Sequence, residues 1–242
     1  MNVFSESIMP EILIYNETYL LAFASTLLSY FLARWLYFKS AKKFYFQPML
    51  IATIILFSFV LTAEIPLVDY QIGTTALSWM IAPLTIGLMI PLFNHLKTIR
   101  SLLSTILLTL LLCGPFTVCI TLVIAYWLGA SKLALLSLSS KSVTTPVALL
   151  IAEEINGVPS LSALIVMVTG IIGTLLAPVI FKILNINDER AQGLTLGLSA
   201  HVIGTAFALE KSAKTAAFSV IAMTLTALLT AVILPLVITI FF

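Results

Sequence analysis

The sequence predicts an all-α polytopic membrane protein, and three observations support that fold class. Of the 242 residues, 61% are hydrophobic and only 9% are charged, whereas an ordinary soluble domain has about 45 to 50% and about 25%. The charged residues separate apolar stretches close to the roughly 20 residues that cross about 30 Å of hydrocarbon. A net charge of +2 and two cysteines exclude a disordered chain, a nucleic-acid partner and a disulfide scaffold. We expect one integral membrane domain over residues 1–242.

The first half of the chain contains four apolar segments that end at charged residues. They cover residues 18–38, 48–63, 73–93 and 101–128. Pro83 interrupts the third segment and Gly114-Pro115 lies within the fourth. Because proline removes a backbone donor and clashes with the preceding turn, we expect a kink at Pro115.

The second half is different, since polar residues enter two of its apolar segments. The segments cover residues 133–155, 161–184, 191–209 and 215–242, and clean and polar-interrupted segments alternate. Together the two halves predict about 6 to 8 transmembrane segments, with discontinuous or re-entrant helices near 133–155 and 191–209. The Pro83 break stands about as far ahead of Lys97 as His201 stands ahead of Lys214, which suggests an internal repeat.

The distribution of Lys and Arg predicts the orientation of the chain. The basic residues after the first and third segments place those loops in the cytoplasm; they are Arg34, Lys39, Lys42, Lys43, Lys97 and Arg100. The acidic and uncleaved N-terminus, with Glu6 and Glu11, then lies outside. If every later segment crossed fully, Lys182 and Arg190 would fall outside, against the rule. A re-entrant segment at 133–155 removes this conflict.

Lys141 is the most informative residue, because it lies in the apolar segment 133–155 among serines and threonines. An intramembrane Lys costs at least about 2.5 to 3.5 kcal/mol and marks a ligand or ion path by default. Pro146 suits the first turn of a helix, so we expect extended backbone leading into a helix from Pro146, capped by Ser or Thr. The ammonium, the hydroxyls of Ser142, Thr144 and Thr145, and a helix N-terminus would suit a small carboxylate.

The second polar break centres on His201. Its candidate functional residues are Ser199, His201, Gly204 and Thr205. A histidine can donate, accept or titrate near physiological pH, and Gly204-Thr205 would loosen the helix just beyond it.

Two structural alternatives stay open at this point. Lys141 could snorkel from a helix end, with the hydroxyls bonded to their own backbone, and His201 could be a satisfied interior residue. The residue patterns that catalysis needs are missing. Ser199 and His201 point apart in a helix and cannot form a dyad, and the sequence holds no HExxH, P-loop or paired intramembrane carboxylate. We expect no enzyme, no metal and no cofactor.

Three stretches resemble the LrgB/CidB family of bacterial membrane proteins: KSVTTP at 141–146, INGVPSLSALIVMVTGIIG at 155–173 and SAHVIGTA at 199–206. The resemblance runs from about Pro48 to the C-terminus. This chain departs from the family pattern at Gln47, Ser140, Ala200 and Phe207. The last departure removes an arginine that would be a second carboxylate-binding cation.

The resemblance implies two functions. Some members of the family resemble carriers of small monocarboxylates, which include pyruvate in bacteria and glycolate or glycerate in plastid relatives. Others are described as holin-like or antiholin-like factors that affect murein hydrolase release and autolysis with an LrgA/CidA-type small membrane partner. A cationic, hydroxyl-rich helix break favours the carrier function. We expect the protein in the bacterial cytoplasmic membrane, where a homo-oligomer is an open alternative to a single chain. The competing readings are a holin-related pore or regulator and a membrane scaffold.

Overall fold

The computed structural model describes residues 17–40 and 46–241, and every regular element in these ranges is a helix. Glu6, Glu11, Lys42 and Lys43, on which part of the predicted orientation rests, lie outside the described residues. The chain divides into two compact units, Met1–Thr85 and Ile86–Phe242, which we describe separately. The prediction of an all-α polytopic membrane protein is confirmed.

Length and composition identify five helices as able to cross a membrane. They are Tyr19–Lys39, Leu103–Trp127, Pro159–Ile183, Glu189–Lys211 and Ala213–Ile238. A shorter apolar helix, Pro48–Thr62, follows the first of them in the chain. These helices lie on the predicted segments to within a few residues, because apolar runs bounded by charges define where helices can cross lipid.

In the first unit, helix α1 (Glu17–Lys39) packs against α2 (Pro48–Thr62) and α3 (Leu67–Gly73). The hydroxyls of Thr26 on α1 and Tyr70 on α3 are hydrogen-bonded at 2.9 Å. A Cβ atom at Gly73 would lie 2.7 Å from the Tyr19 carbonyl oxygen, so the close approach of α3 to α1 requires glycine there.

The predicted third span, 73–93, is not one continuous helix. The chain forms short helices instead: α4 (Thr75–Trp79), α5 (Ile81–Gly87), α6 (Ile90–Asn94) and α7 (Leu96–Ser101). Two prolines, Pro83 and Pro91, lie inside this stretch and each lacks the backbone donor that a continuous helix needs.

The second unit begins its membrane elements with the long helix α8 (Leu103–Trp127), which continues through Pro115. Then come α9 (Lys132–Ser139) and α10 (Thr145–Glu154), joined by a turn at 140–144. This pair forms the first hairpin. Its base closes on the start of α11 (Pro159–Ile183), where the Val158 amide donates to Ser137 Oγ at 2.8 Å and Ser162 Oγ donates to the Ser137 carbonyl at 3.0 Å.

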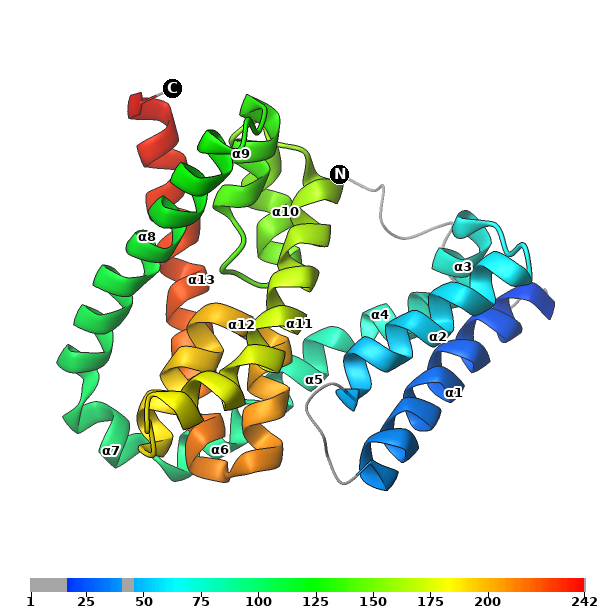
Figure 1. The fold of residues 1–242 in the computed structure, drawn as a ribbon, viewed down its shortest axis with the longest axis horizontal. Coiled ribbons are helices and arrows are strands. Elements are labelled where there is room, and N and C mark those ends of the chain that lie inside the picture. Colours follow the sequence, from blue (N-terminus) through cyan, green and yellow to red (C-terminus); the bar gives the residue numbers. More distant parts are fainter. Residues whose placement is uncertain (1–16, 41–45, 242) are drawn as a thin grey trace, which may run out of the picture. The chain divides into compact units, whose positions relative to one another are not determined.

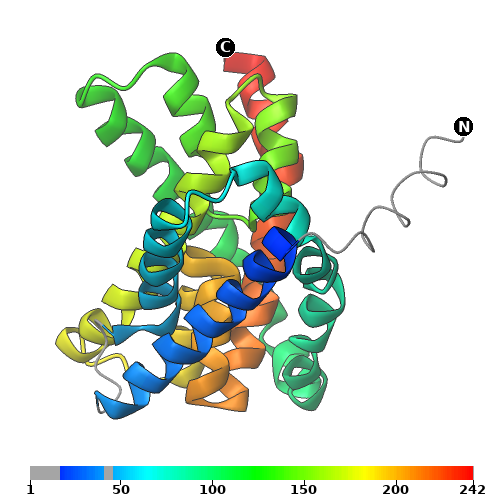
Figure 2. The same cartoon turned by 90° about the vertical axis from the view of Figure 1, so that its right-hand side faces the viewer.

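The first hairpin is re-entrant, as the sequence predicts for 133–155. Helices of 8 and 10 residues extend about 12 and 15 Å, roughly half of the hydrocarbon thickness. Neither arm is long enough to cross, so the chain enters and leaves the hairpin at the same end of the unit. Figure 1 shows α9 and α10 side by side near the C-terminal end of α13 (Ala213–Phe241), and Figure 2 agrees.

Helix α12 (Glu189–Lys211) folds back on itself and forms a second hairpin. Lys211 Nζ donates to Gln192 Oε1 across 19 residues, which a straight helix would separate by about 28 Å. Leu196 and Ala208 also share one buried cluster. The reversal occurs at His201, whose φ of 42° and ψ of −122° are not helical.

The two hairpins enter the second unit from opposite ends. Figures 1 and 2 show the base of α12 beside the start of α13, and the first hairpin beside its other end. Contacts among α11, α12 and α13 place Lys182, Arg190, Lys211 and Lys214 at the base of the second hairpin. Helix α7, which carries Lys97 and Arg100, packs through Ile99 on the start of α13, whereas Lys132 begins the first hairpin. By the positive-inside rule we expect the base of the second hairpin to face the cytoplasm. Two re-entrant hairpins thus resolve the charge conflict that the sequence poses.

The base of the second hairpin is held by polar contacts. Asp188 caps α12 by accepting from the Arg190 amide at 2.8 Å, and the hydrogen bond from the Arg190 side chain lowers the pKa of the Asp188 carboxyl to about 2. The cap is therefore ionised at neutral pH, as an N-terminal carboxylate should be. Gln192 Nε2 donates to the Ile186 carbonyl, and Lys211 lies 5.7 Å from the Phe181 ring centre.

Candidate functional site

The tips of the two hairpins meet at Lys141 and His201. The Nε2 atom of His201 lies 2.9 Å from the main-chain carbonyl oxygen of Lys141. A carbonyl can only accept, so Nε2 carries the proton in this contact. The two polar breaks that the sequence singles out, 60 residues apart, thus form one site inside the second unit.

The break in the first hairpin is a tight turn rather than the predicted extended segment. The Lys141 amide donates to the Leu138 carbonyl at 3.1 Å and the Val143 amide to the Ser140 carbonyl at 3.3 Å. Thr144, just before α10, is extended, with φ −75° and ψ 152°. The turn forms because α9 ends at Ser139 and its last carbonyls are satisfied by the following amides.

Lys141 is half-buried at this tip, and its ammonium donates to the buried Ser142 hydroxyl at 3.1 Å. Lys141 takes no part in the ion pairs of Arg190 with Asp188 or of Lys214 with Glu189, and the group that its ammonium meets is a hydroxyl. A cation without a carboxylate partner in a membrane protein can accept an anionic ligand.

Helix α10 presents its N-terminus at the same tip. It begins at Thr145, with Pro146 in its first turn, as the sequence predicts within one residue. The predicted side-chain cap is wrong, because Thr144 at the N-cap position makes no capping hydrogen bond. The half-buried Thr144 and Thr145 and the exposed Pro146 therefore leave the first-turn amides open to another acceptor.

His201 is 2% exposed and stands in a strained conformation. Its φ and ψ match the first central position of a type II′ turn, which normally requires glycine. A non-glycine residue there costs of order 1–3 kcal/mol and persists where the surroundings fix it. The sequence predicts that the helix loosens at Gly204-Thr205, but the helical geometry is broken at His201 itself.

The remaining predicted residues support His201. The fully buried Thr205 donates its hydroxyl to the His201 carbonyl at 2.7 Å and is hydrogen-bonded to Ser219 at 2.9 Å. A Cβ at Gly204 would lie 2.5 Å from the Leu196 carbonyl, so the fold-back requires glycine there. The half-buried Ser199 donates to the Thr195 carbonyl at 2.6 Å, not to His201.

Sequence reasoning missed the partners that other helices supply. Gly170 on α11 faces the tip, and a Cβ there would lie 3.4 Å from His201 Cε1 and 2.8 Å from Ile203 Cδ1. Ser219 on α13 is the hydroxyl that meets Thr205. The glycine could have been flagged from its place in a clean span, whereas nothing in the sequence distinguishes Ser219 from other helix serines.

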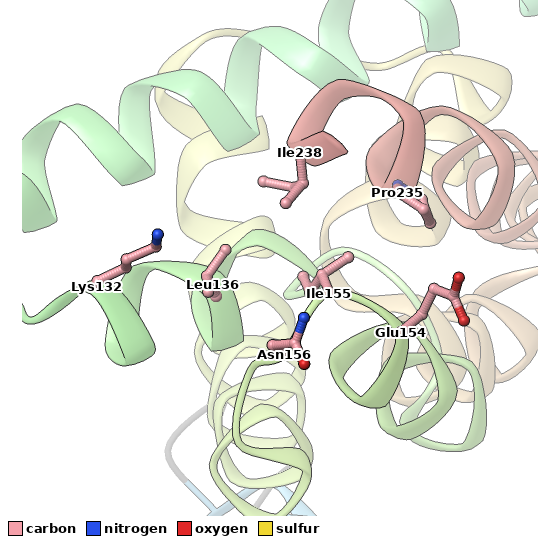
Figure 3. Close-up of a pocket in the computed structure, with 7 residues that line it drawn as sticks. All are labelled: Lys132, Leu136, Glu154, Ile155, Asn156, Pro235 and Ile238. Carbon is pink, nitrogen blue, oxygen red and sulfur yellow. The ribbon is translucent and has the colours of Figure 1, made fainter. Parts of the chain in front are cut away.

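Among the cavities lined by described residues, two adjoin the first hairpin, and neither is lined by Lys141 or His201. One, of about 230 Å³, lies at the base of the first hairpin (Figure 3). There Lys132 and Glu154 lie toward opposite ends, with Ile155 and Asn156 between them and Ile238 of α13 above them in the view. The other, of about 180 Å³, lies among α8, α13 and the end of α9.

These features define a class: an integral membrane protein whose two re-entrant hairpins enter from opposite ends and meet at a cationic, hydroxyl-rich site. The chain belongs to the LrgB-like family, whose model matches residues 26–240. The match confirms the resemblance and begins before Pro48.

Curated relatives agree with this assignment. The chain is 32% identical over 186 residues to an uncharacterized protein, YwbG, of Bacillus subtilis, covering 77% of this chain and 83% of the relative. It is 31% identical over 199 residues to the holin-like protein CidB of Staphylococcus epidermidis, covering 81% and 86%. It is 27% identical over 201 residues to the antiholin-like protein LrgB of Bacillus cereus, covering 83% and 87%. No solved structure matches the chain at a significant level.

Proposed function

We propose that this chain is a secondary carrier, and not an enzyme, for small 2-hydroxy or 2-oxo monocarboxylates such as pyruvate, glycolate, glycerate or lactate. The observation that carries the proposal is the contact between the two hairpin tips at Lys141 and His201. Secondary transporters are often built from inverted repeats with a binding site at their interface, formed by discontinuous helices. Here each hairpin precedes a long helix, α11 or α13, that runs in the opposite direction to the other.

The carboxylate would bind at the tip of the first hairpin. Lys141 supplies the counter-charge, and Ser142, Thr144 and Thr145 supply hydroxyl groups. The uncapped N-terminus of α10 adds main-chain donors and roughly half a positive charge. An open, substrate-indifferent pore has no need of this combination.

The second hairpin would recognise the oxygen substituent. His201 stands at its tip, and its Nε2–H group is already aligned with the first hairpin. Thr205 and Gly204 hold the histidine through the contacts described above, and Ser199 lies two residues before it. A substrate that took the Nε2–H bond would replace the Lys141 carbonyl and separate the tips, which couples binding to movement.

Access would then alternate between the two ends of the second unit. The cavity beside Lys132 and Asn156 would be the outer mouth (Figure 3). It is separated from the tip by a buried apolar cluster that contains Leu136, Val143 and Ile155. At the cytoplasmic end, the contact between Gln192 and Lys211 closes the base of the second hairpin.

Uptake by reconstituted protein tests this proposal. Vesicles containing the purified chain should take up labelled pyruvate saturably, in competition with lactate or glycolate. Lys141→Gln should lower uptake at least tenfold while the protein stays folded, and Lys141→Arg should keep part of it. Equal uptake by wild type and Lys141→Gln would remove Lys141 from the site.

A holin-like or antiholin-like role has its own support, because relatives carry those names and none of the three relatives described above is named for a carboxylate. In that reading the chain would act with a small LrgA/CidA-type membrane protein, or as a homo-oligomer, in the bacterial cytoplasmic membrane. Dye leakage from vesicles that is insensitive to carboxylates and to Lys141→Gln would favour this role over the carrier.

A further inference from the structure

The second cavity lies beside both hairpin tips. Ser139, at the end of α9, lines it two residues before Lys141, and two residues span at most about 7 Å. Gly114 of α8 lines the opposite side, where a Cβ would come within 3.9 Å of Leu198, three residues before His201. A ligand held at the tips could therefore extend into this cavity.

The lining of the cavity is aliphatic apart from a few hydroxyls. Leu, Ile and Val side chains of α8 and α13 make up most of it. Its volume is about 180 Å³, and an apolar cavity of about 150 Å³ is known to bind a benzene-sized molecule. This space suits a chain of a few carbons better than the hydroxyl groups of glycerate.

One polar group in the cavity has no partner. Thr226 of α13 is 3% exposed and lines the cavity, and its Oγ1 atom makes no hydrogen bond within the described chain. A buried unsatisfied hydroxyl is costly, so it calls for a ligand atom. Ser139 Oγ donates to the Leu136 carbonyl at 2.6 Å and keeps its acceptor lone pairs.

We infer that this cavity binds the aliphatic chain of the substrate, so that the carrier prefers 2-oxo and 2-hydroxy monocarboxylates of four to six carbons over two- and three-carbon acids. The inference rests on the proposed function. The carboxylate lies at Lys141, the chain fills the space between α8 and α13, and Thr226 meets an oxygen at the C2 end of the ligand.

Binding to purified protein in detergent, measured by calorimetry, tests the inference. The ligands are pyruvate, 2-oxobutanoate, 2-oxopentanoate and 2-oxohexanoate. In the wild type the Kd should fall about fourfold with each added methylene. Val118→Phe, which fills the cavity from α8, should abolish this gain and leave pyruvate binding unchanged. Val123→Phe is the matched control, since Val123 is 49% exposed on the same helix and does not line the cavity.

Thr226→Val provides a second variant that does not depend on tolerance of a bulky side chain. It should raise the Kd for all four acids several-fold without lowering the melting temperature, because it removes a hydroxyl that has no partner in the folded chain. A structural role for Thr226 would instead lower the melting temperature.

The outcomes separate the inference from the proposed function. Lys141-dependent pyruvate binding without a gain along the series would overturn the inference and leave the carrier intact. A gain that persists in Val118→Phe would also overturn it, because the substrate chain would then lie outside this cavity. Absence of binding by every acid would overturn both.

Discussion

His201 determines the geometry of the site because one residue carries both the reversal of α12 and the contact with the first hairpin. Its positive φ stores strain that a glycine would not have. A side chain is retained at such a position where it binds something that glycine cannot. The strain and the hydrogen bond to Lys141 are independent observations, and both indicate that His201 has a functional role at this position.

Substitution of His201 should separate these two roles. His201→Ala keeps the strained backbone and loses the hydrogen bond, so it should destabilise the protein by about 1 kcal/mol. His201→Gly also loses the bond but relieves about 1–3 kcal/mol of strain. Thermal unfolding in detergent should therefore rank glycine above alanine, while both variants lose pyruvate uptake. An alanine variant more stable than the glycine variant would mean that φ is not positive at this position.

At the scale of elements, the second hairpin depends on close packing of its first arm against α13. A Cβ at Gly197 would clash with the Ser219 carbonyl oxygen and lie 2.8 Å from Ala222 Cβ, and Gly193 is similarly close to Thr215. Small residues let helices approach in lipid, where no hydrophobic force drives them together. The α12 and α13 helices form the most extensive helix contact of the second unit.

Gly197→Ala should destabilise the protein by about 1–3 kcal/mol, since the added methyl has no space against backbone. Gly87→Ala is the matched control, because a Cβ at Gly87 meets nothing within 4 Å. Melting temperatures of the two purified variants provide the measurement. Equal melting temperatures for Gly197→Ala and the wild type would contradict the packing of α12 on α13.

The sequence predicted the helices and both polar breaks, because apolar runs, Pro146 and an intramembrane Lys141 are local signals. It also predicted a discontinuous or re-entrant helix near 191–209, but not that α12 reverses its direction at His201. The 23 residues of α12 have the length of a full span, and a positive φ at histidine has no sequence signature. The contacts of His201 with Lys141 and Gly170 are tertiary and could not be read from spacing.

At the scale of the whole chain, the positions of the few charged residues indicate helix ends and the candidate site, because a charge inside lipid is costly. Six basic residues gather at one end of the second unit, and Lys141 stands apart from them at a hairpin tip. The interpretation of residues 1–242 as a single membrane domain stays a prediction. The family match over 26–240 shows only that both units belong to one LrgB-like chain.

The central claim is that two re-entrant hairpins enter from opposite faces and meet at Lys141 and His201. Side-specific labelling with a membrane-impermeant thiol reagent tests it most directly, in intact cells and in inverted vesicles. Single cysteines are placed at Asn156, Arg190 and Lys211 in a background with Cys113 and Cys119 replaced by alanine. The Asn156→Cys variant should react only from outside, and the Arg190→Cys and Lys211→Cys variants only from the cytoplasm. Labelling of 190 and 211 from opposite faces would mean that α12 crosses the membrane, and would contradict the claim.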